Sequence, residues 1–362
     1  MKGKGWFGLW KNNSDLLAHD YVQCFQEQMS LVYDPVINEY RNQPGVETRV
    51  PNFGSTKAFS HKNPLKPEWC LGKLRVALEK LGYRDGDTMF GAPYDIRYAP
   101  PVPGQTSEVY SGYFKEFMGL VESVSKKKQK KAVIFGHSFG GMVALEFVRN
   151  TPLAWRKKYI KHLILVSPTL SNGFMEPVTN FAIGTDILFI PTTTPLSTRP
   201  MWRSFESAIM NFPSPTVFGH KPLVITRQRN YSAYDMEHFL TALGFSEAVE
   251  PFKKRAIPQM NYFKAPMVPM TSINGVGNKT PLQLIFWEND FDSSPEAVYS
   301  DGDGKINLIS VLAFDKEMRR QSGQNKQFKS IKIDKAQHST IVTYDFALKR
   351  VIQEILEANR IS

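Results

Sequence analysis

One short pattern constrains the fold of this chain more than any other: G-H-S-F-G at residues 136–140. The apolar run at 132–135 before it predicts a buried strand, and apolar residues recur over 142–148 at spacings that suit a buried helix. A serine between two glycines at a strand-to-helix junction is typical of a nucleophile elbow, which exposes the serine hydroxyl at the carboxyl edge of a parallel sheet. The pattern therefore predicts Ser138 as a nucleophile and the backbone N–H of Phe139 as a donor to a developing oxyanion. A chance match to G-x-S-x-G is the competing interpretation.

A serine nucleophile needs a base and an acid that orients the base, and in folds with this elbow the acid and then the histidine follow the serine. An acidic turn at residues 301–304 reads D-G-D-G, and its Asp303 is predicted as the orienting acid. His338 is the one histidine of seven that lies beyond this turn. It follows Ile331 and Ile333, whose alternation with lysines predicts a last strand, and it precedes a predicted helix from Tyr344 to Leu356. His338 is therefore predicted as the general base, and a histidine with a structural hydrogen bond is the alternative.

The acidic turn has two competing interpretations. D-G-D-G-K-I also resembles the middle of a calcium-binding EF-hand loop, but that alignment puts Tyr299 and Ser310 where the loop needs an aspartate and a bidentate glutamate. A plain solvated turn is the other alternative. Asp301 lies in the same turn, and Asp303 is preferred over it because Asp303 is nearer to the apolar segment that follows.

Composition limits the classes of protein that fit. At 362 residues with 42% apolar and 22% charged residues, the chain can bury a sizeable core, as one large domain or one domain with a cap. No run of about 20 apolar residues is present, so no membrane span is predicted. The net charge of +11 favours anionic surfaces. The densest lysine cluster, over residues 126–131, is interpreted as a solvated turn, with a lipid-binding or nucleic-acid-binding patch as the alternative. Without zinc spacing, a phosphate-binding glycine loop or a nucleic-acid motif, we expect no metal, no cofactor and no nucleic-acid partner.

Proline and glycine positions divide the chain into three predicted parts. Residues 1–168 hold the first strands and the elbow, and residues 263–362 return to strand, acidic turn, strand and helix. Residues 169–262 between them are predicted to be an insertion. Because lids over catalytic sites arise in such insertions, we expect this one to form a cap.

Several motifs together carry a family resemblance. They are P-G-V-E-T-R-V-P-N-F-G at 44–54, G-A-P-Y-D-I-R at 91–97, the elbow, and D-G-D-G-K-I-N at 301–307, with further similarity at 155–162 and 230–234. In this order and spacing they resemble the lecithin:cholesterol acyltransferase family, and in particular its plant lecithin:cholesterol acyltransferase-like 1 type. The resemblance implies an α/β-hydrolase fold with a mainly parallel central sheet and a cap or lid insertion.

The resemblance also implies an activity and its residues. A serine-dependent enzyme of this kind takes an acyl chain from a phospholipid onto Ser138 and passes it to water or to a lipid alcohol such as a sterol. Asp303 and His338 complete its catalytic set. Trp10, in an aromatic cluster near the start, falls in the region implied to bind acyl chains and touch a lipid surface. Peripheral association with a membrane and a location in the secretory pathway or vacuole are implied as well, although no secretory signal is visible at residues 1–4.

Departures from the family pattern lead to a second functional hypothesis. Family members carry an earlier strand and a Pro-Gly loop, ahead of the segment that resembles residues 6–10, and this loop supplies a second oxyanion donor. The chain is expected to lack both, and loss of one such donor costs about 10²–10³ in rate. The alternative is therefore a catalytically impaired, lipid-binding relative. Lys305-Ile306 and residues 169–173 also differ from the usual Thr-Val and Trp-Gly-Gly, which is expected to affect substrate handling.

Overall fold

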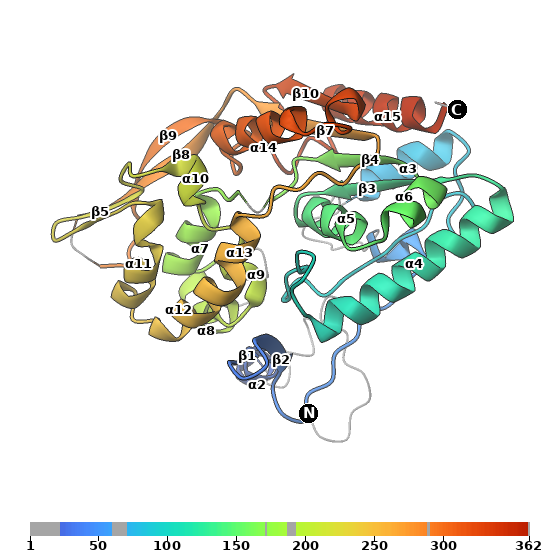
Figure 1. Ribbon diagram of the computed structural model, residues 1–362. Coiled ribbons are helices and arrows are strands. Elements are labelled where there is room, and N and C mark those ends of the chain that lie inside the picture. Colours follow the sequence, from blue (N-terminus) through green and yellow to red (C-terminus); the bar gives the residue numbers. More distant parts are fainter. Residues whose placement is uncertain (1–21, 60–70, 171, 187–192, 288–289, 361–362) are drawn as a thin grey trace.

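The computed structural model of the chain is built around a four-stranded parallel sheet (Figure 1). The structure describes residues 22–59, 71–170, 172–186, 193–287 and 290–360. Trp10 lies outside these ranges. The strands of the sheet are β3 (Ala132–His137), β4 (Ile160–Val166), β7 (Met270–Val276) and β10 (Phe328–Asp334), in the order β10-β7-β4-β3. All three pairings between them are parallel. The apolar runs predicted as the elbow strand and the last strand are β3 and β10.

Helices cover both faces of this sheet, and the side chains of β4 show how. Leu163 and Leu165 pack with α5, whereas Ile164 and Val166 pack with α15. Successive side chains of a strand point to opposite faces, so a strand covered on both sides is apolar throughout. The helices that surround the central sheet are α3 (Gly72–Lys80), α4 (Glu108–Lys128), α5 (Phe139–Arg149), α6 (Leu153–Tyr159), α14 (Leu308–Arg320) and α15 (Asp345–Arg360).

A group of short helices lies between β4 and β7 in the chain and stands beside the central sheet (Figure 1). Its helices are α7 (Glu176–Ile183), α8 (Pro195–Arg203), α9 (Glu206–Met210), α10 (Pro215–Phe218), α11 (Met236–Ala242), α12 (Val249–Pro251), a π-helical turn at Phe252–Ala256 and α13 (Ile257–Met260), with 3-10 turns at Ala233–Asp235 and Ser246–Ala248. A second sheet has the order β6-β5-β8-β9. Its strands are β5 (Val224–Thr226), β6 (Asn230–Tyr231), β8 (Asn278–Phe286) and β9 (Glu296–Gly302).

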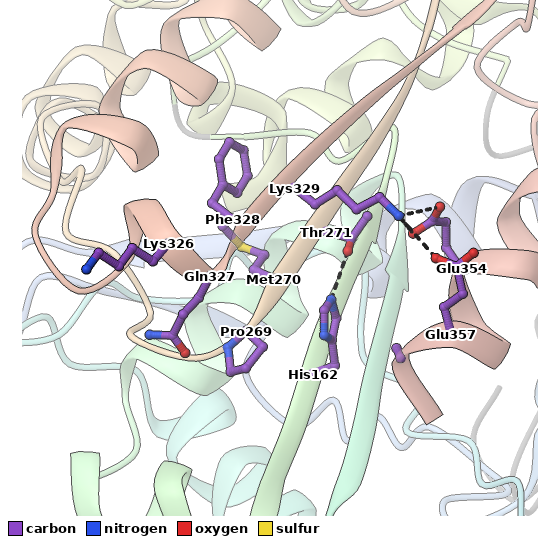
Figure 2. Close-up of a pocket in the computed structure, with 11 residues that line it drawn as sticks. His162, Pro269, Met270, Thr271, Lys326, Gln327, Phe328, Lys329, Glu354 and Glu357 are labelled. Carbon is purple, nitrogen blue, oxygen red and sulfur yellow. Dashed lines mark hydrogen bonds and ion pairs between the residues drawn. The ribbon is translucent and has the colours of Figure 1, made fainter. Parts of the chain in front are cut away.

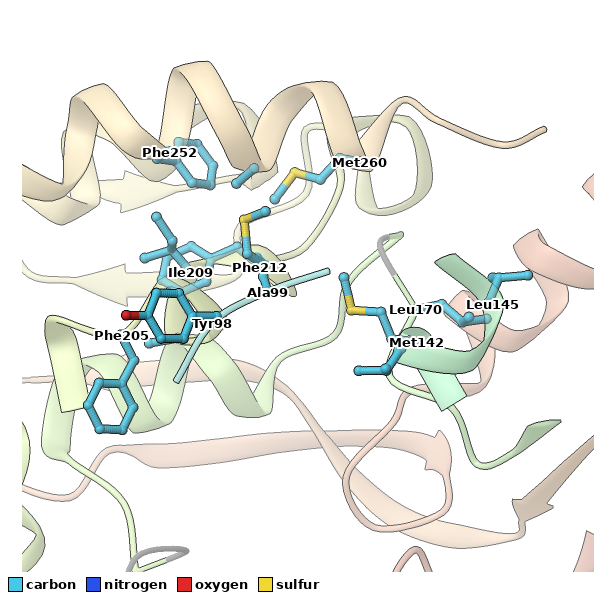
Figure 3. Close-up of a cluster of buried hydrophobic side chains, with 14 of the residues drawn as sticks. Tyr98, Ala99, Met142, Leu145, Leu170, Phe205, Ile209, Phe212, Phe252 and Met260 are labelled. Carbon is cyan, nitrogen blue, oxygen red and sulfur yellow. The ribbon is translucent and has the colours of Figure 1, made fainter. Parts of the chain in front are cut away.

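One hydrophobic cluster joins the inserted helices to the sheet layer (Figure 3). Phe205, Phe212 and Phe252 come from the insertion, and Met142 and Leu145 come from α5; all five side chains are buried. Because this core is continuous, the inserted helices form a cap fixed on the sheet layer. A parallel sheet with helices on both faces, an elbow after β3 and a helical cap confirms the predicted α/β-hydrolase class. The predicted limits of the cap, residues 169 and 262, stay a prediction.

A buried ion pair adds a polar connection between the cap and the rest of the chain. The carboxylate of Glu206 on α9 accepts from the guanidinium of Arg255, and its other oxygen accepts the backbone N–H of Ala99 at 3.0 Å. Arg255 also donates to the carbonyl oxygens of Asn38 and Thr106. Glu206 and Arg255 are each about 1% exposed, so hydrogen-bond and ion-pair partners within the protein, and not water, must stabilise both charges.

The amino-terminal described segment forms α2 (Val22–Met29) and a hairpin of β1 (Leu31–Asp34) and β2 (Glu39–Asn42). The remaining short turns are 3-10 helices at Thr56–Phe59 and Asn325–Gln327. In the ranges given above, no helix is both long enough and apolar enough to cross a membrane.

Only half of the lysine cluster at 126–131 is the solvated turn that was predicted. Its first three residues form the last turn of α4, and only residues 129–131 form the exposed connection to β3. Lysines are stabilised at the carboxyl end of a helix because the helix dipole is negative there, and this favours helix over turn. Lys128 also pairs with Asp87, which holds that last turn in place.

Candidate active site

The turn after β3 holds Ser138 in an unusual backbone conformation. Its φ of 56° and ψ of −130° lie outside the regions that most residues adopt, and α5 begins directly after it. The backbone N–H of Ser138 donates to the carbonyl oxygen of Val166 at 3.0 Å, which fixes the turn to β4. Gly136 is required here, because a Cβ at that position would lie 2.3 Å from the carbonyl oxygen of Gly140. The turn has the geometry of a nucleophile elbow.

Three side chains that are far apart in the sequence meet at this turn. The Oγ atom of Ser138 lies 2.8 Å from Nε2 of His338. The other ring nitrogen of His338, Nδ1, lies 2.9 Å from Oδ2 of Asp303. His338 and Asp303 are almost fully buried, at 7% and 2% exposure. The structure thus brings together the three residues that the sequence analysis predicted, in one hydrogen-bonded chain from carboxylate to hydroxyl.

The environment of Asp303 keeps its carboxylate charged. Burial alone would raise the pKa of Asp303, but the nearby charge of His338, its hydrogen bond and the backbone N–H groups of Ile306 and Lys305 outweigh burial and lower that pKa. The two N–H groups donate to Oδ1 at 2.7 and 3.0 Å. Asp301 makes a different contact, because its Oδ1 accepts the N–H of Gly277 at 2.6 Å. The two carboxylates of the turn therefore have separate partners.

The backbone of the turn and of the histidine loop meet closely over the end of β7. The N–H of His338 donates to the carbonyl oxygen of Asp303 at 2.8 Å. Gly275 lies beneath this contact, and a Cβ there would be 2.0 Å from the carbonyl oxygen of Ala336 and 3.1 Å from Cβ of Asp303. A glycine at this position therefore lets the base and its acid approach each other.

Phe139 is the first residue of α5, where backbone N–H groups have no acceptor within the helix. This N–H is next to Ser138 in the chain and belongs to the positive end of the helix dipole. The Phe139 ring packs on Tyr94, with ring centroids 5.8 Å apart. Tyr94 belongs to the motif at 91–97, whose Arg97 is 1% exposed and donates to Asp95 and Asn42. That motif therefore connects the elbow to the β1–β2 hairpin.

Lys305, one of the departures from the family pattern, contacts the cap. Its ammonium pairs with the carboxylate of Glu176, the first residue of α7. The acidic turn is thus joined to the cap by an ion pair that is partly exposed.

His137 is a residue of the site that the sequence analysis did not assign. Its Nε2 lies 3.0 Å from the backbone carbonyl oxygen of His338. Burial, and then the charge of His338, lower the pKa of His137 to about 4, so its ring is neutral at neutral pH. Chain order had removed it from consideration as a base, because it precedes the acidic turn.

A separate hollow of about 340 Å³ lies at the other end of the strands (Figure 2). It is lined at the starts of β4, β7 and β10, and several of its polar side chains are paired with one another. Nε2 of His162 lies 2.8 Å from Oγ1 of Thr271, and Lys329 binds Glu354 and Glu357. Since Ser138 follows the carboxyl end of β3, this hollow is no part of the serine site.

In the described ranges of the chain, no group of three or more His, Cys, Asp or Glu side chains is placed so that it could hold a metal ion. The arrangement at Ser138 instead has the parts of covalent acyl chemistry: a hydroxyl, an imidazole that can take its proton, a carboxylate behind the imidazole and a helix amino terminus. Fold and site together define an α/β-hydrolase whose serine, aspartate and histidine follow one another in the chain order usual for this fold.

Comparison with known proteins identifies the family. The family model described as lecithin:cholesterol acyltransferase matches residues 6–255. The chain is 39% identical to a lecithin-cholesterol acyltransferase-like 1 of Oryza sativa subsp. japonica, over 98% of this chain and 78% of that protein. It is 38% identical to the protein of the same description in Arabidopsis thaliana, over 98% and 81%. A lysosomal phospholipase A and acyltransferase of Rattus norvegicus is 29% identical, over 96% and 82%. The chain belongs to the lecithin:cholesterol acyltransferase family, as its motifs predicted.

Proposed function

We propose that this protein is a serine-dependent lipid acyl hydrolase or O-acyltransferase that acts on phospholipid acyl esters. The observation that carries the proposal is the hydrogen-bonded chain from Asp303 through His338 to Ser138, with distances of 2.9 and 2.8 Å. Membership of a family whose relatives are described as phospholipases and acyltransferases supplies the substrate class.

The first half of the reaction transfers the acyl chain to the enzyme. His338 takes the proton of Ser138 at Nε2 while Oγ adds to the ester carbonyl carbon. The negative charge that develops on the carbonyl oxygen faces the Phe139 N–H at the start of α5. When the intermediate collapses, His338 gives the proton to the departing lysophospholipid oxygen, and the acyl chain remains on Ser138. Asp303 holds the ring of His338 in the tautomer that can accept a proton at Nε2 and stabilises the imidazolium.

The second half repeats these steps with a new acceptor. Water or the hydroxyl of a lipid alcohol loses its proton to His338 and attacks the acyl carbonyl, which releases a fatty acid or a new ester. A lipid substrate and a lipid acceptor both require the protein to work at a lipid surface, so we propose peripheral association with a membrane.

The test uses two serines that both follow parallel strands and both have positive φ. Ser138→Ala is expected to abolish labelling by a fluorophosphonate and the release of fatty acid from phospholipid vesicles. Ser167 follows β4 with φ of 41° and is fully buried, so Ser167→Ala is the matched control and is expected to keep both activities. Product analysis with vesicles that contain or lack sterol shows whether the acyl chain is transferred to water, as a fatty acid, or to the sterol, as a sterol ester. Labelling that survives Ser138→Ala contradicts the mechanism, and a wild-type protein that binds vesicles without labelling or turnover supports the impaired, lipid-binding alternative.

A further inference from the structure

The backbone of His338 is held by two hydrogen bonds from different parts of the fold. Its N–H donates to the carbonyl oxygen of Asp303 at 2.8 Å, and its own carbonyl oxygen lies 3.0 Å from Nε2 of His137. A carbonyl oxygen can only accept, so Nε2 of His137 carries the hydrogen of this bond. The peptide groups on both sides of the His338 Cα are therefore fixed.

The order of the strands explains why the loop with His338 needs such bonds. This loop follows β10, whereas Ser138 follows β3, and the two strands lie on opposite sides of β7 and β4. With neighbouring strands about 4.8 Å apart, the loop spans roughly 14 Å of the sheet edge before the ring reaches the serine. Residues 335–344 form turns without a strand or helix, so no regular ladder sets their position.

We propose that His137 is a positioning residue: the bond from its Nε2–H to the carbonyl oxygen of His338 sets the His338 ring between Ser138 and Asp303. The inference rests on the proposed function of the serine site. His137 is the last residue of β3, directly before Ser138. One strand end thus supplies both the candidate nucleophile and the clamp on its base, so the two move together.

The protonation state of His137 suits this role. The two imidazole rings lie 5.5 Å apart, centroid to centroid. His338 becomes positively charged when it takes the serine proton, and a second positive charge at this distance would oppose that step. The lowered pKa of His137, about 4, keeps its ring neutral, so it donates its hydrogen bond without adding charge.

His162 provides a matched comparison for a merely structural histidine. It lies on the neighbouring strand β4, is 8% exposed and has a pKa lowered to about 4 by burial and by the charge of Lys329. Its Nε2 bonds with Oγ1 of Thr271 at the far end of the strands from Ser138 (Figure 2). Loss of this ring removes one buried hydrogen bond without touching the serine site.

Three variants of the full chain test the proposal through the rate of fluorophosphonate labelling and the melting temperature. His137→Phe keeps a planar aromatic ring and removes the donor, and its labelling is expected to slow by about 10²-fold, the effect of a base misplaced by about 1 Å. In His137→Gln the amide N–H can reach the same carbonyl oxygen, so labelling is expected to stay close to wild type. His162→Phe is expected to lower the melting temperature and leave labelling unchanged.

A second measurement does not depend on turnover. The proton between Nδ1 of His338 and Asp303 is expected to give a far-downfield NMR resonance, which a His338→Ala control should lack. We expect His137→Phe to lose or shift this resonance, and His137→Gln and His162→Phe to keep it. If His137→Phe is labelled at the wild-type rate and keeps the resonance unchanged, the positioning role of His137 is wrong, while the proposed function of the serine site still stands. If the wild-type protein is not labelled at all, the proposed function fails, and the resonance still decides whether His137 positions His338.

Discussion

The replacement of Asp303 by asparagine tests the orienting acid most directly, because it changes one oxygen into an NH₂ group at constant shape. The carboxylate serves two sets of partners. Oδ1 accepts the backbone N–H groups of Lys305 and Ile306, and Oδ2 accepts from Nδ1 of His338 at 2.9 Å. Asparagine has a single acceptor oxygen, so only one of these sides keeps its hydrogen bonds.

The balance between the two orientations of the amide follows from the number of donors on each side. If the NH₂ group faces the backbone, the buried N–H of Ile306 loses its acceptor, at about 1–3 kcal/mol, and so does the part-buried N–H of Lys305. If it faces His338, the ring avoids this loss by a change of tautomer. Nδ1 then accepts from the amide, and the hydrogen moves to Nε2. That second orientation is favoured, and in it Nε2 faces Ser138 as a donor and cannot take the serine proton.

Loss of the correct tautomer is expected to lower turnover by about 10⁴, or about 5.5 kcal/mol of activation free energy. Asp301→Asn is the matched control from the same turn. Asp301 is exposed and accepts one backbone N–H, from Gly277 at 2.6 Å, which an asparagine oxygen can still accept. The assay is phospholipid turnover together with fluorophosphonate labelling, on variants with melting temperatures within a few degrees of wild type. Equal losses in the two variants, or a larger loss in Asp301→Asn, would refute the assignment of Asp303.

Two further predictions concern stability. Burial, aided by the charge of Lys329, lowers the pKa of His162 from 6.5 to about 4, so between these pH values the unfolded chain binds a proton that the folded chain does not. The free energy of unfolding should therefore decrease as the pH is lowered through this window, by up to about 3 kcal/mol for this group. In urea unfolding, the decrease in this free energy from pH 7 to pH 5 should be smaller for His162→Phe than for the wild-type protein. Glu206→Ala leaves the buried Arg255 without its carboxylate and should cost about 3–5 kcal/mol in urea unfolding. Glu250→Ala, which removes an exposed pair with Lys254, is the control and should cost far less; similar losses in the two variants would contradict the importance of burial.

The parts of the fold that were predicted correctly are those with a strong local pattern. The elbow strand β3 and the last strand β10 have continuous or alternating apolar residues, and α15 has helical spacing. Such periodicities arise because each element buries one side or both sides, so a few consecutive residues are enough to recognise the element. The lysine cluster at 126–131 lacked this signal, and its helical half was missed. The helix dipole, which stabilises those lysines, leaves no apolar pattern.

The candidate site was predictable in its members and not in its contacts. Chain order reduced seven histidines to His338 and pointed to one acidic turn. It could not show that Asp301 and Asp303 have separate partners, because the difference depends on how β9 pairs with β8. That pairing brings the backbone of Gly277 to Asp301 and leaves Asp303 beside His338. Long-range pairing of this kind has no trace in the sequence around either residue.

His137 shows how a local pattern could reach further than it did. Val133 and Phe135 pack against the layer that contains α15, whereas Ile134 packs on the opposite side with α5. Side chains of a strand alternate, so His137 continues the series that faces α15. The loop that enters α15 must contain His338 if His338 is the base, because the predicted helix begins only a few residues later. Alternation along β3 therefore directs His137 toward the His338 loop, and a backbone carbonyl of that loop can accept a hydrogen bond from its ring. A hydrogen-bond donor that is adjacent to the nucleophile in the sequence, and that lies on the same side of the strand as the loop with the base, is thus a signal for a positioning residue.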